Sequence, residues 1–96
     1  MPDEKQILMK VGMNEQEAKT YLALLDLGES TATKIAERAG IERVNTYQII
    51  NNLIEKGAAS YIIKNNIRHF SAVDPNKLLK DMQSKEEELK NILPSL

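Results

Sequence analysis

Residues 31–57 read TATKIAERAGIERVNTYQIINNLIEKG, and this stretch decides the fold. Its pattern predicts two helices joined by a tight turn, the second of them long. Ala36 has the small side chain that a close helix contact requires, and Ile41 is the aliphatic residue expected to be buried beyond the turn. Gly40 supplies the backbone freedom that a short interhelical turn demands. We therefore expect a helix-turn-helix unit here.

The second helix of this unit has two contrasting faces. At about 100° per residue, one face carries an apolar stripe, which also takes in a threonine where an aliphatic side chain is the usual choice. The stripe consists of Thr46, Tyr47, Ile49, Ile50, Leu53 and Ile54. The opposite face, with Val44 at its edge, carries amides and one guanidinium, the groups that read base edges in a DNA major groove. The candidate base-contacting residues are Arg43, Asn45, Gln48 and Asn52. A solvated amphipathic helix is the alternative reading.

Residues 58–73, which follow at once, predict a two-stranded β-hairpin. Side chains that favour strands lie on both sides of Asn65-Asn66, and this pair suits the positive-φ positions of a tight hairpin turn. A hairpin directly after a helix-turn-helix unit forms a wing that can lie along the phosphate backbone. The alternative is a hairpin that only closes the core. His69 is expected on the outer face of the second strand, and we assign it no chemistry.

Phosphate contacts are expected from two places in the chain. Hydroxyl and free N–H groups at the start of a helix can hold a phosphate, and so can polar or basic groups on a wing. Thr31 is also the expected N-cap of the first helix of the unit, so its hydroxyl has a second possible role. The candidates are Ser30, Thr31, Thr33, Lys34, Lys64, Asn65, Asn66 and Arg68.

Two helices are expected before this unit. Residues 3–11 suggest a short helix with Ile7, Leu8 and Val11 turned inward, closed by Gly12. Asn14 and Glu17 form a capping-box pattern at the start of the next helix. That helix, which ends at Gly28, is expected to be the main core helix and to bury Ala18, Tyr21, Leu22, Leu24 and Leu25.

A last helix begins at Asp74-Pro75, a cap followed by proline at the first helical position. Its apolar residues follow alternating spacings of four and three, a heptad seam with one polar interruption. The seam is Leu78, Met82, Lys85, Leu89, Ile92 and Leu96. We expect a homodimer formed through Leu78, Met82, Leu89 and Ile92. The chain then divides into a winged helix-turn-helix domain, residues 1–73, and a dimerisation helix, residues 74–96.

Composition narrows the function classes. The chain has 96 residues, a net charge of −1, no cysteine and one histidine. We therefore expect no cofactor site and no metal site, and we do not expect the chain to be an enzyme. No apolar run approaches the roughly 20 residues of a membrane span, and no signal-peptide pattern is present, so we expect a cytoplasmic, nucleoid-associated protein without a membrane partner. Only residues 41–73 have a basic excess, with four basic and two acidic residues.

The combined pattern resembles the N-terminal winged-helix domain of the TrmB family of archaeal transcriptional regulators. The resemblance spans about residues 6–80 and is carried by residues 14–57 and by IRHFSAVDP at the wing exit. It implies that Arg43, Asn45, Tyr47 and Gln48 lie at the DNA face, and it adds Tyr47 to the phosphate-contacting candidates. The sequence departs from the family pattern at Glu42, Asn45 and Thr46, where proline, a basic residue and an aliphatic residue are usual.

The family commonly continues past this helix into an effector-binding, often sugar-binding, domain. We expect no small-molecule effector site within these 96 residues. Overall, the sequence predicts an α+β winged-helix fold and a sequence-specific regulator that binds double-stranded DNA. The alternatives are an architectural DNA-binding protein, which the net charge disfavours because non-specific affinity rests on many phosphate contacts, and a winged-helix module that binds proteins only.

Overall fold

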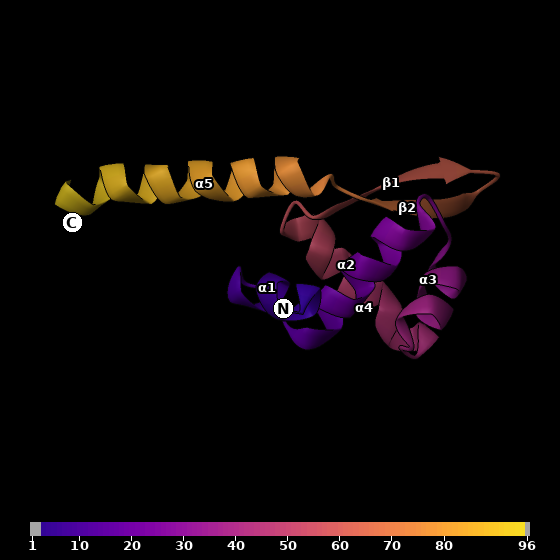
Figure 1. Cartoon of the computed structure of the whole chain (residues 1–96). Helices are drawn as coiled ribbons and strands as arrows, with labels where there is room; N and C mark the ends of the chain where they lie inside the picture. The colour runs from indigo at the N-terminus through magenta and orange to yellow at the C-terminus, as the bar shows by residue number, and fades with distance from the viewer. Residues whose placement is uncertain (1–2, 96) are drawn as a thin grey trace.

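The computed structural model describes residues 3–95, so Leu96 of the predicted seam lies outside the described residues. The elements in chain order are α1 (Glu4–Lys10), α2 (Glu15–Leu27), α3 (Ala32–Ala39), α4 (Arg43–Glu55), β1 (Ala59–Lys64), β2 (Ile67–Ala72), α5 (Pro75–Ile92) and a short 3-10 helix, η1 (Leu93–Ser95). Helices α1 to α4 form the body of the molecule, and the β1–β2 hairpin lies above it (Figure 1). This is the predicted winged-helix α+β architecture.

Helix α2 is the centre of the core, as predicted. Asn14 caps it with the full capping box, in which Asn14 Oδ1 accepts from the Glu17 N–H and Glu17 Oε1 accepts from the Asn14 N–H. The α2 side chains Ala18, Tyr21 and Leu24 are buried. They pack with side chains from the other elements, chiefly Ile35, Ile50, Leu53, Phe70 and Leu78.

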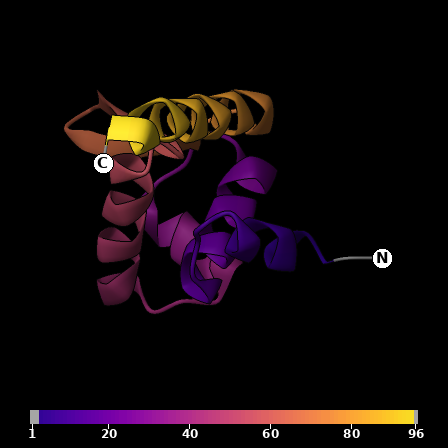
Figure 2. The same ribbon diagram turned by 90° about the vertical axis from the view of Figure 1, so that its left-hand side faces the viewer.

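Three side chains that were expected to lie inward at the N-terminal helices, Ile7, Val11 and Leu25, are instead exposed. Helix α1 has no buried residue: Leu8 is half-buried, whereas Ile7 and Val11 are exposed. On α2, Leu22 is half-buried and Leu25 is exposed. Ile7 and Leu25 line a hollow between α1, α2 and the start of α5, and Figure 2 shows α1 below α5. The apolar stripes are therefore wider than the surface that the fold buries.

The helix-turn-helix unit forms as predicted. Gly40 ends α3 with φ 71° and ψ 36°, a left-handed conformation that side chains with a Cβ adopt at a cost. Thr46 is fully buried, and its hydroxyl donates a 2.9 Å hydrogen bond to the Glu42 carbonyl, which satisfies the polar group within the apolar stripe. Tyr47 is a correction, because it is 44% exposed and does not belong to the buried stripe.

The wing is a regular antiparallel pair in which Tyr61 faces Phe70 and Lys64 faces Ile67. Asn65 and Asn66 both have positive φ, 51° and 63°, which is the conformation of a two-residue type I′ turn. Ser30 extends the sheet by one bridge, since its N–H and carbonyl both bond to the backbone of Phe70. This bridge fixes the wing to the start of α3.

Helix α5 leaves the body on the side opposite to the wing tip (Figure 1). Asp74 caps it and Pro75 occupies its first turn, as predicted. Leu78 is a correction to the dimer seam, because it is 4% exposed and packs in the core of its own chain, with Met82 half-buried beside it. Leu89 and Ile92 are exposed. Within residues 3–95, no helix combines the length and the apolarity that crossing a bilayer needs.

Candidate nucleic-acid interface

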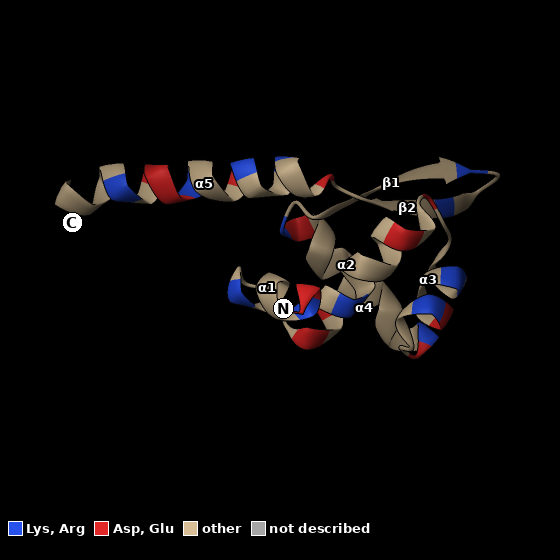
Figure 3. Ribbon diagram, in the orientation of Figure 1, with Lys and Arg blue, Asp and Glu red and all other residues tan. Residues whose placement is uncertain are grey.

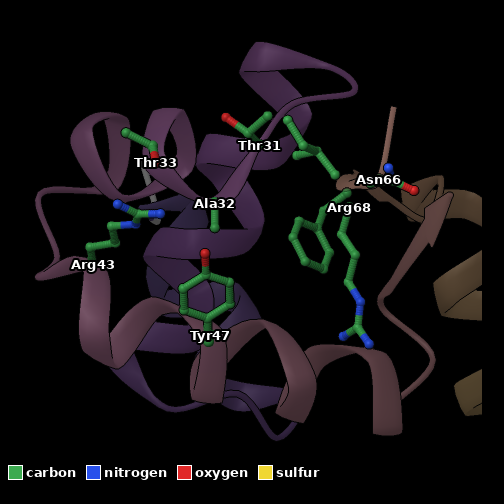
Figure 4. A pocket seen from close by; sticks show the side chains of 9 residues that line it. Thr31, Ala32, Thr33, Arg43, Tyr47, Asn66 and Arg68 are labelled. Carbon is green, nitrogen blue, oxygen red and sulfur yellow. The ribbon is translucent and has the colours of Figure 1, made fainter. Parts of the chain in front are cut away.

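One open hollow of about 500 Å³ joins the three elements that were predicted to contact nucleic acid. Its walls are the start of α3, the first half of α4, and the wing (Figure 4). Tyr47 points from α4 toward the start of α3, whereas Asn66 and Arg68 lie on the opposite wall. The lining residues are Thr31, Ala32, Thr33, Arg43, Tyr47, Asn66, Ile67, Arg68 and Phe70. Six of these were predicted as contact residues from the sequence.

The exposed side of α4 divides into three rows. Residues of an α-helix follow one another at about 100°, so Arg43 lies roughly 40° from Tyr47, and these two form the row at the hollow. Directly opposite the buried side lie Val44, Gln48 and Asn51, all exposed, which we call the outer row. Asn45 and Asn52 lie roughly 140–160° from Tyr47, on the far flank of the helix.

The amides of α4 are partly organised before any ligand binds. Gln48 Nε2 donates a 3.0 Å hydrogen bond to Oδ1 of Asn52, one turn later on the helix. Asn52 is half-buried, whereas Gln48 is exposed. The bond restricts the Gln48 rotamer and leaves its amide oxygen and second N–H hydrogen free to pair with a base edge.

The basic groups at the hollow and on the wing differ in how they are engaged. Arg68 lies over the ring of Tyr61, with 4.8 Å between the guanidinium carbon and the ring centroid. Lys64 Nζ lies 2.6 Å from Oε1 of Glu29, so part of its charge is neutralised within the chain. Basic segments on the wing and on α3 lie among acidic ones (Figure 3). The positive potential of this surface therefore depends mainly on Arg43, Arg68 and Lys34.

The start of α3 also presents polar groups. Thr31 is the N-cap residue, but its side chain makes no capping hydrogen bond, and Thr33 and Lys34 are exposed in the first turn. Ser30 differs, because its side chain is buried and its hydroxyl donates to the Gly28 carbonyl at 3.4 Å. This burial argues against the phosphate contact expected of Ser30, whose role here is to pair with β2.

An ion pair with one buried partner holds the far end of α4. Lys56, the C-cap residue, donates from Nζ to Glu17 Oε1 at 2.7 Å and to the Gly12 carbonyl at 3.0 Å. Burial alone would raise the pKa of the Glu17 carboxyl. The hydrogen bonds from Lys56 and from the Asn14 N–H, together with the Lys56 charge, outweigh this effect and lower the pKa. The pair thus fixes the axis of α4 relative to α2.

The exit of the wing is fixed in a similar way. The Tyr21 hydroxyl donates a 2.7 Å hydrogen bond to the Val73 carbonyl, between β2 and α5. Burial, and next the negative charge of Asp74, raise the pKa of this hydroxyl. Tyr21 therefore stays a neutral donor at physiological pH, and the wing keeps its position over the body.

Sequence reasoning missed three residues of this surface. Asn51 was not singled out, although the helical period places it beside Val44 and Gln48 in the outer row. Val44 was assigned only to an edge, yet it is 76% exposed. Glu29 was not connected with Lys64, because no local signal in the sequence indicates a contact across 35 positions. Within the described residues, no group of three His, Cys, Asp or Glu side chains could hold a metal ion.

Comparison with known proteins agrees with this geometry. Residues 8–76 match the family model described as "Sugar-specific transcriptional regulator TrmB". The chain is similar to the HTH-type sugar sensing transcriptional regulator TrmBL1 of Pyrococcus furiosus, with 33% identity over 95 residues, which is 95% of this chain and 28% of that protein.

Two solved structures share the fold. TrmBL2, an archaeal chromatin protein, superposes with a TM-score of 0.84 at 24% identity, over 96% of this chain and 37% of that one. A Staphylococcus aureus MepR mutant bound to an oligodeoxyribonucleotide superposes with a TM-score of 0.67 at 16% identity, over 96% and 71%. The chain spans about a third of the length of its TrmB-type relatives. On the match over residues 8–76, the chain belongs to the TrmB family of sugar-specific transcriptional regulators.

Proposed function

We propose that this chain binds double-stranded DNA and recognises a specific sequence as part of a transcriptional regulator. The observation that carries the proposal is the open hollow, at which the start of α3, the first half of α4 and the wing present polar and basic side chains toward the same space. An α-helix fits the B-DNA major groove, and a wing beside it can follow the neighbouring phosphates. Helix α4 is the element that enters the groove.

Each row of α4 makes a different kind of contact with DNA. Arg43 contacts guanine or a phosphate at the groove edge, and Gln48 in the outer row pairs with an adenine edge. Asn45 and Asn52, on the far flank, contact bases or the backbone toward the other groove edge. Thr31, Thr33 and Lys34 hold a phosphate at the start of α3, where the helix dipole favours negative charge. Tyr47, Lys64, Asn65, Asn66 and Arg68 hold phosphates along the wing side.

Two relatives support DNA as the partner. The MepR mutant of similar fold was solved with an oligodeoxyribonucleotide, and TrmBL2 is described as showing a novel mode of DNA binding. TrmBL2 is also described as a chromatin protein, which favours architectural binding as a second candidate function. The net charge of −1 favours the sequence-specific candidate, because non-specific affinity rests on neutralising many phosphates.

We also propose that the chain forms a homodimer through the second half of α5. Leu89 and Ile92 are exposed along a helix that extends beyond the body, and a second copy of the helix would cover them. We exclude Leu78 from the seam, because its side chain packs in the core of its own chain. The dimer would then present two α4 helices to half-sites separated by about one turn of DNA or a multiple of it.

The experiment that separates the two functions is selection of binding sites from random duplexes, followed by titration at several salt concentrations. A sequence-specific regulator enriches a motif and binds it about 10³-fold or more tightly than a scrambled duplex. An architectural protein binds both duplexes alike with a steep salt dependence. If neither duplex binds at physiological salt, the proposed function is wrong.

A further inference from the structure

Val44 has an unusual position for an aliphatic residue. At 76% exposure it is the most exposed of the large hydrophobic side chains in residues 3–95. It occupies the second position of α4, within the part of the helix that borders the hollow. It also belongs to the outer row, one helical turn before Gln48, on the side of α4 directly opposite the buried residues.

Among residues 3–95, no packing contact explains a valine at this position. β-Branched residues are weaker helix formers than Arg, Lys, Gln and Glu, because the preceding turn restricts their side-chain rotamers. Val44 is not part of the hydrophobic core and gains no stabilisation from burial. A position that departs from local preference without a structural gain points to a functional surface. Since this position lies among base-reading candidates, its aliphatic surface requires an apolar partner on DNA.

The major-groove edges of the base pairs offer one such partner. The C5-methyl group of thymine is the apolar group that distinguishes an A·T pair there, and side chains with methyl groups contact it. The outer row of a helix inserted in the groove reaches closest to the groove floor, where this methyl group lies. Gln48, held by Asn52 one turn further on, stands beside Val44 to pair with a neighbouring adenine.

We propose that Val44 determines specificity by packing its two methyl groups on the C5-methyl of one thymine in each half-site. This inference rests on the proposed DNA-binding function and deepens it by naming the base that the first turn of α4 selects. The side chain needs no rearrangement to make the contact, because neither methyl group is engaged in the protein core.

Deoxyuridine tests this contact, because it keeps the Watson–Crick pairing of thymidine and lacks only the methyl group. Thymines of the selected duplex are replaced by deoxyuridine one at a time, and binding of the whole chain is followed by fluorescence anisotropy at constant salt. The wild-type chain should lose about fourfold in affinity at one thymine per half-site, the ratio expected for one buried methyl group.

Three variants complete the experiment. Val44→Ser should bind the thymine and deoxyuridine duplexes equally at that position, whereas Val44→Ile should keep the preference. Leu25→Ser, a change at another exposed aliphatic residue on α2, should keep the wild-type ratio. Circular dichroism melting of Val44→Ser should match the wild type, because the side chain is outside the core.

The results separate the two levels of the proposal. Sequence-specific binding without any thymine-methyl dependence, or a dependence that Val44→Ser retains, overturns the role of Val44 and leaves the proposed function intact. Failure to enrich any sequence from random duplexes overturns the proposed function and the role of Val44 together.

Discussion

The ammonium group of Lys56 lies 2.7 Å from the Glu17 carboxylate, which is only 2% exposed. The two residues lie 39 positions apart and join the end of α4 to the start of α2. Helix α4, which we propose to enter the groove, is therefore held at the end opposite to its first turn. Removing the exposed partner of such an ion pair destabilises the protein, because the remaining charge stays buried without a partner.

Replacement of Lys56 by methionine should lower the free energy of unfolding by about 1–2 kcal/mol, because Glu17 loses its charge-assisted partner. The value stays below that of a fully buried pair because Lys56 is 44% exposed and partly screened by solvent. Urea unfolding at pH 7 measures it. Lys77→Met, which breaks the exposed Lys77–Asp81 pair, is the matched control and should change stability by less than about 0.5 kcal/mol. Equal effects of both changes would contradict the role of the Glu17 pair.

Protonation of Glu17 at low pH should lower the free energy of unfolding of the wild-type protein. Its folded-state pKa lies below the ordinary value of 4.5, so the carboxylate contributes stability that is present above pH 4.5 and is lost as the pH falls through the folded-state pKa. Glu17→Gln keeps an oxygen for the Asn14 N–H but has no titrating group. Its unfolding free energy should therefore fall less than that of the wild type between pH 5 and pH 3 in parallel urea titrations. Parallel curves for the two proteins would argue against this role.

The stability of the protein should depend on whether the residues in the turn of the wing tolerate a positive φ. Asn66 has φ 63°, so Asn66→Val should destabilise the protein by about 1–2 kcal/mol, the cost of a left-handed conformation for a residue with a branched Cβ. Asn66→Gly is the matched control and should be neutral or slightly stabilising, because glycine suits this turn. Thermal melting followed by circular dichroism compares them. A melting temperature that is equal in both variants would show that the turn adopts another conformation in solution.

Base contacts and phosphate contacts should respond differently to mutation. Gln48→Ala should reduce discrimination against a mismatched base pair by about 1–3 kcal/mol. Arg68→Ala should instead weaken binding to every duplex alike and reduce the salt slope by about one. Titration of the selected and scrambled duplexes at several salt concentrations measures both effects. If the two variants behave identically, the assignment of α4 to bases and of the wing to phosphates is wrong.

The dimer proposal predicts that the two ends of α5 behave differently. Ile92→Asp should leave the chain folded and convert a dimer into a monomer, because an exposed residue of the proposed seam acquires a charge. Leu78→Asp should instead unfold the chain, because it places a carboxylate in the core. Sedimentation at micromolar concentration, combined with circular dichroism, measures both outcomes. A wild-type chain that sediments as a monomer would contradict the proposal.

Local signals in the sequence predicted most of the fold. These signals act within a few residues, so they can be recognised in the sequence alone. They are the capping box at Asn14, the glycine after α3, the Asn-Asn turn and the Asp-Pro start of α5. Thr46, a polar residue in the buried stripe, is also satisfied locally, by a carbonyl one helical turn earlier. Its buried hydroxyl is acceptable only because the Glu42 carbonyl accepts from it.

The candidate site was less predictable than the fold. Tyr47 fitted the apolar stripe by period, but the hollow between α3 and the wing leaves its ring exposed. Leu78 fitted a dimer seam by spacing, yet the body of the same chain covers it. Hydrophobic spacing indicates which residues share a face, and it does not indicate which surface that face meets.

The sequence by itself determined the order and the bounds of the elements, because caps, turns and periodicity are interactions between near neighbours along the chain. The tertiary structure decided which residues share one surface: Thr31, Arg43 and Arg68 around the hollow, Lys64 against Glu29, and Lys56 against buried Glu17. These contacts join residues that are far apart in sequence. Their distances depend on how the helices and the wing pack together, and no local pattern encodes that packing.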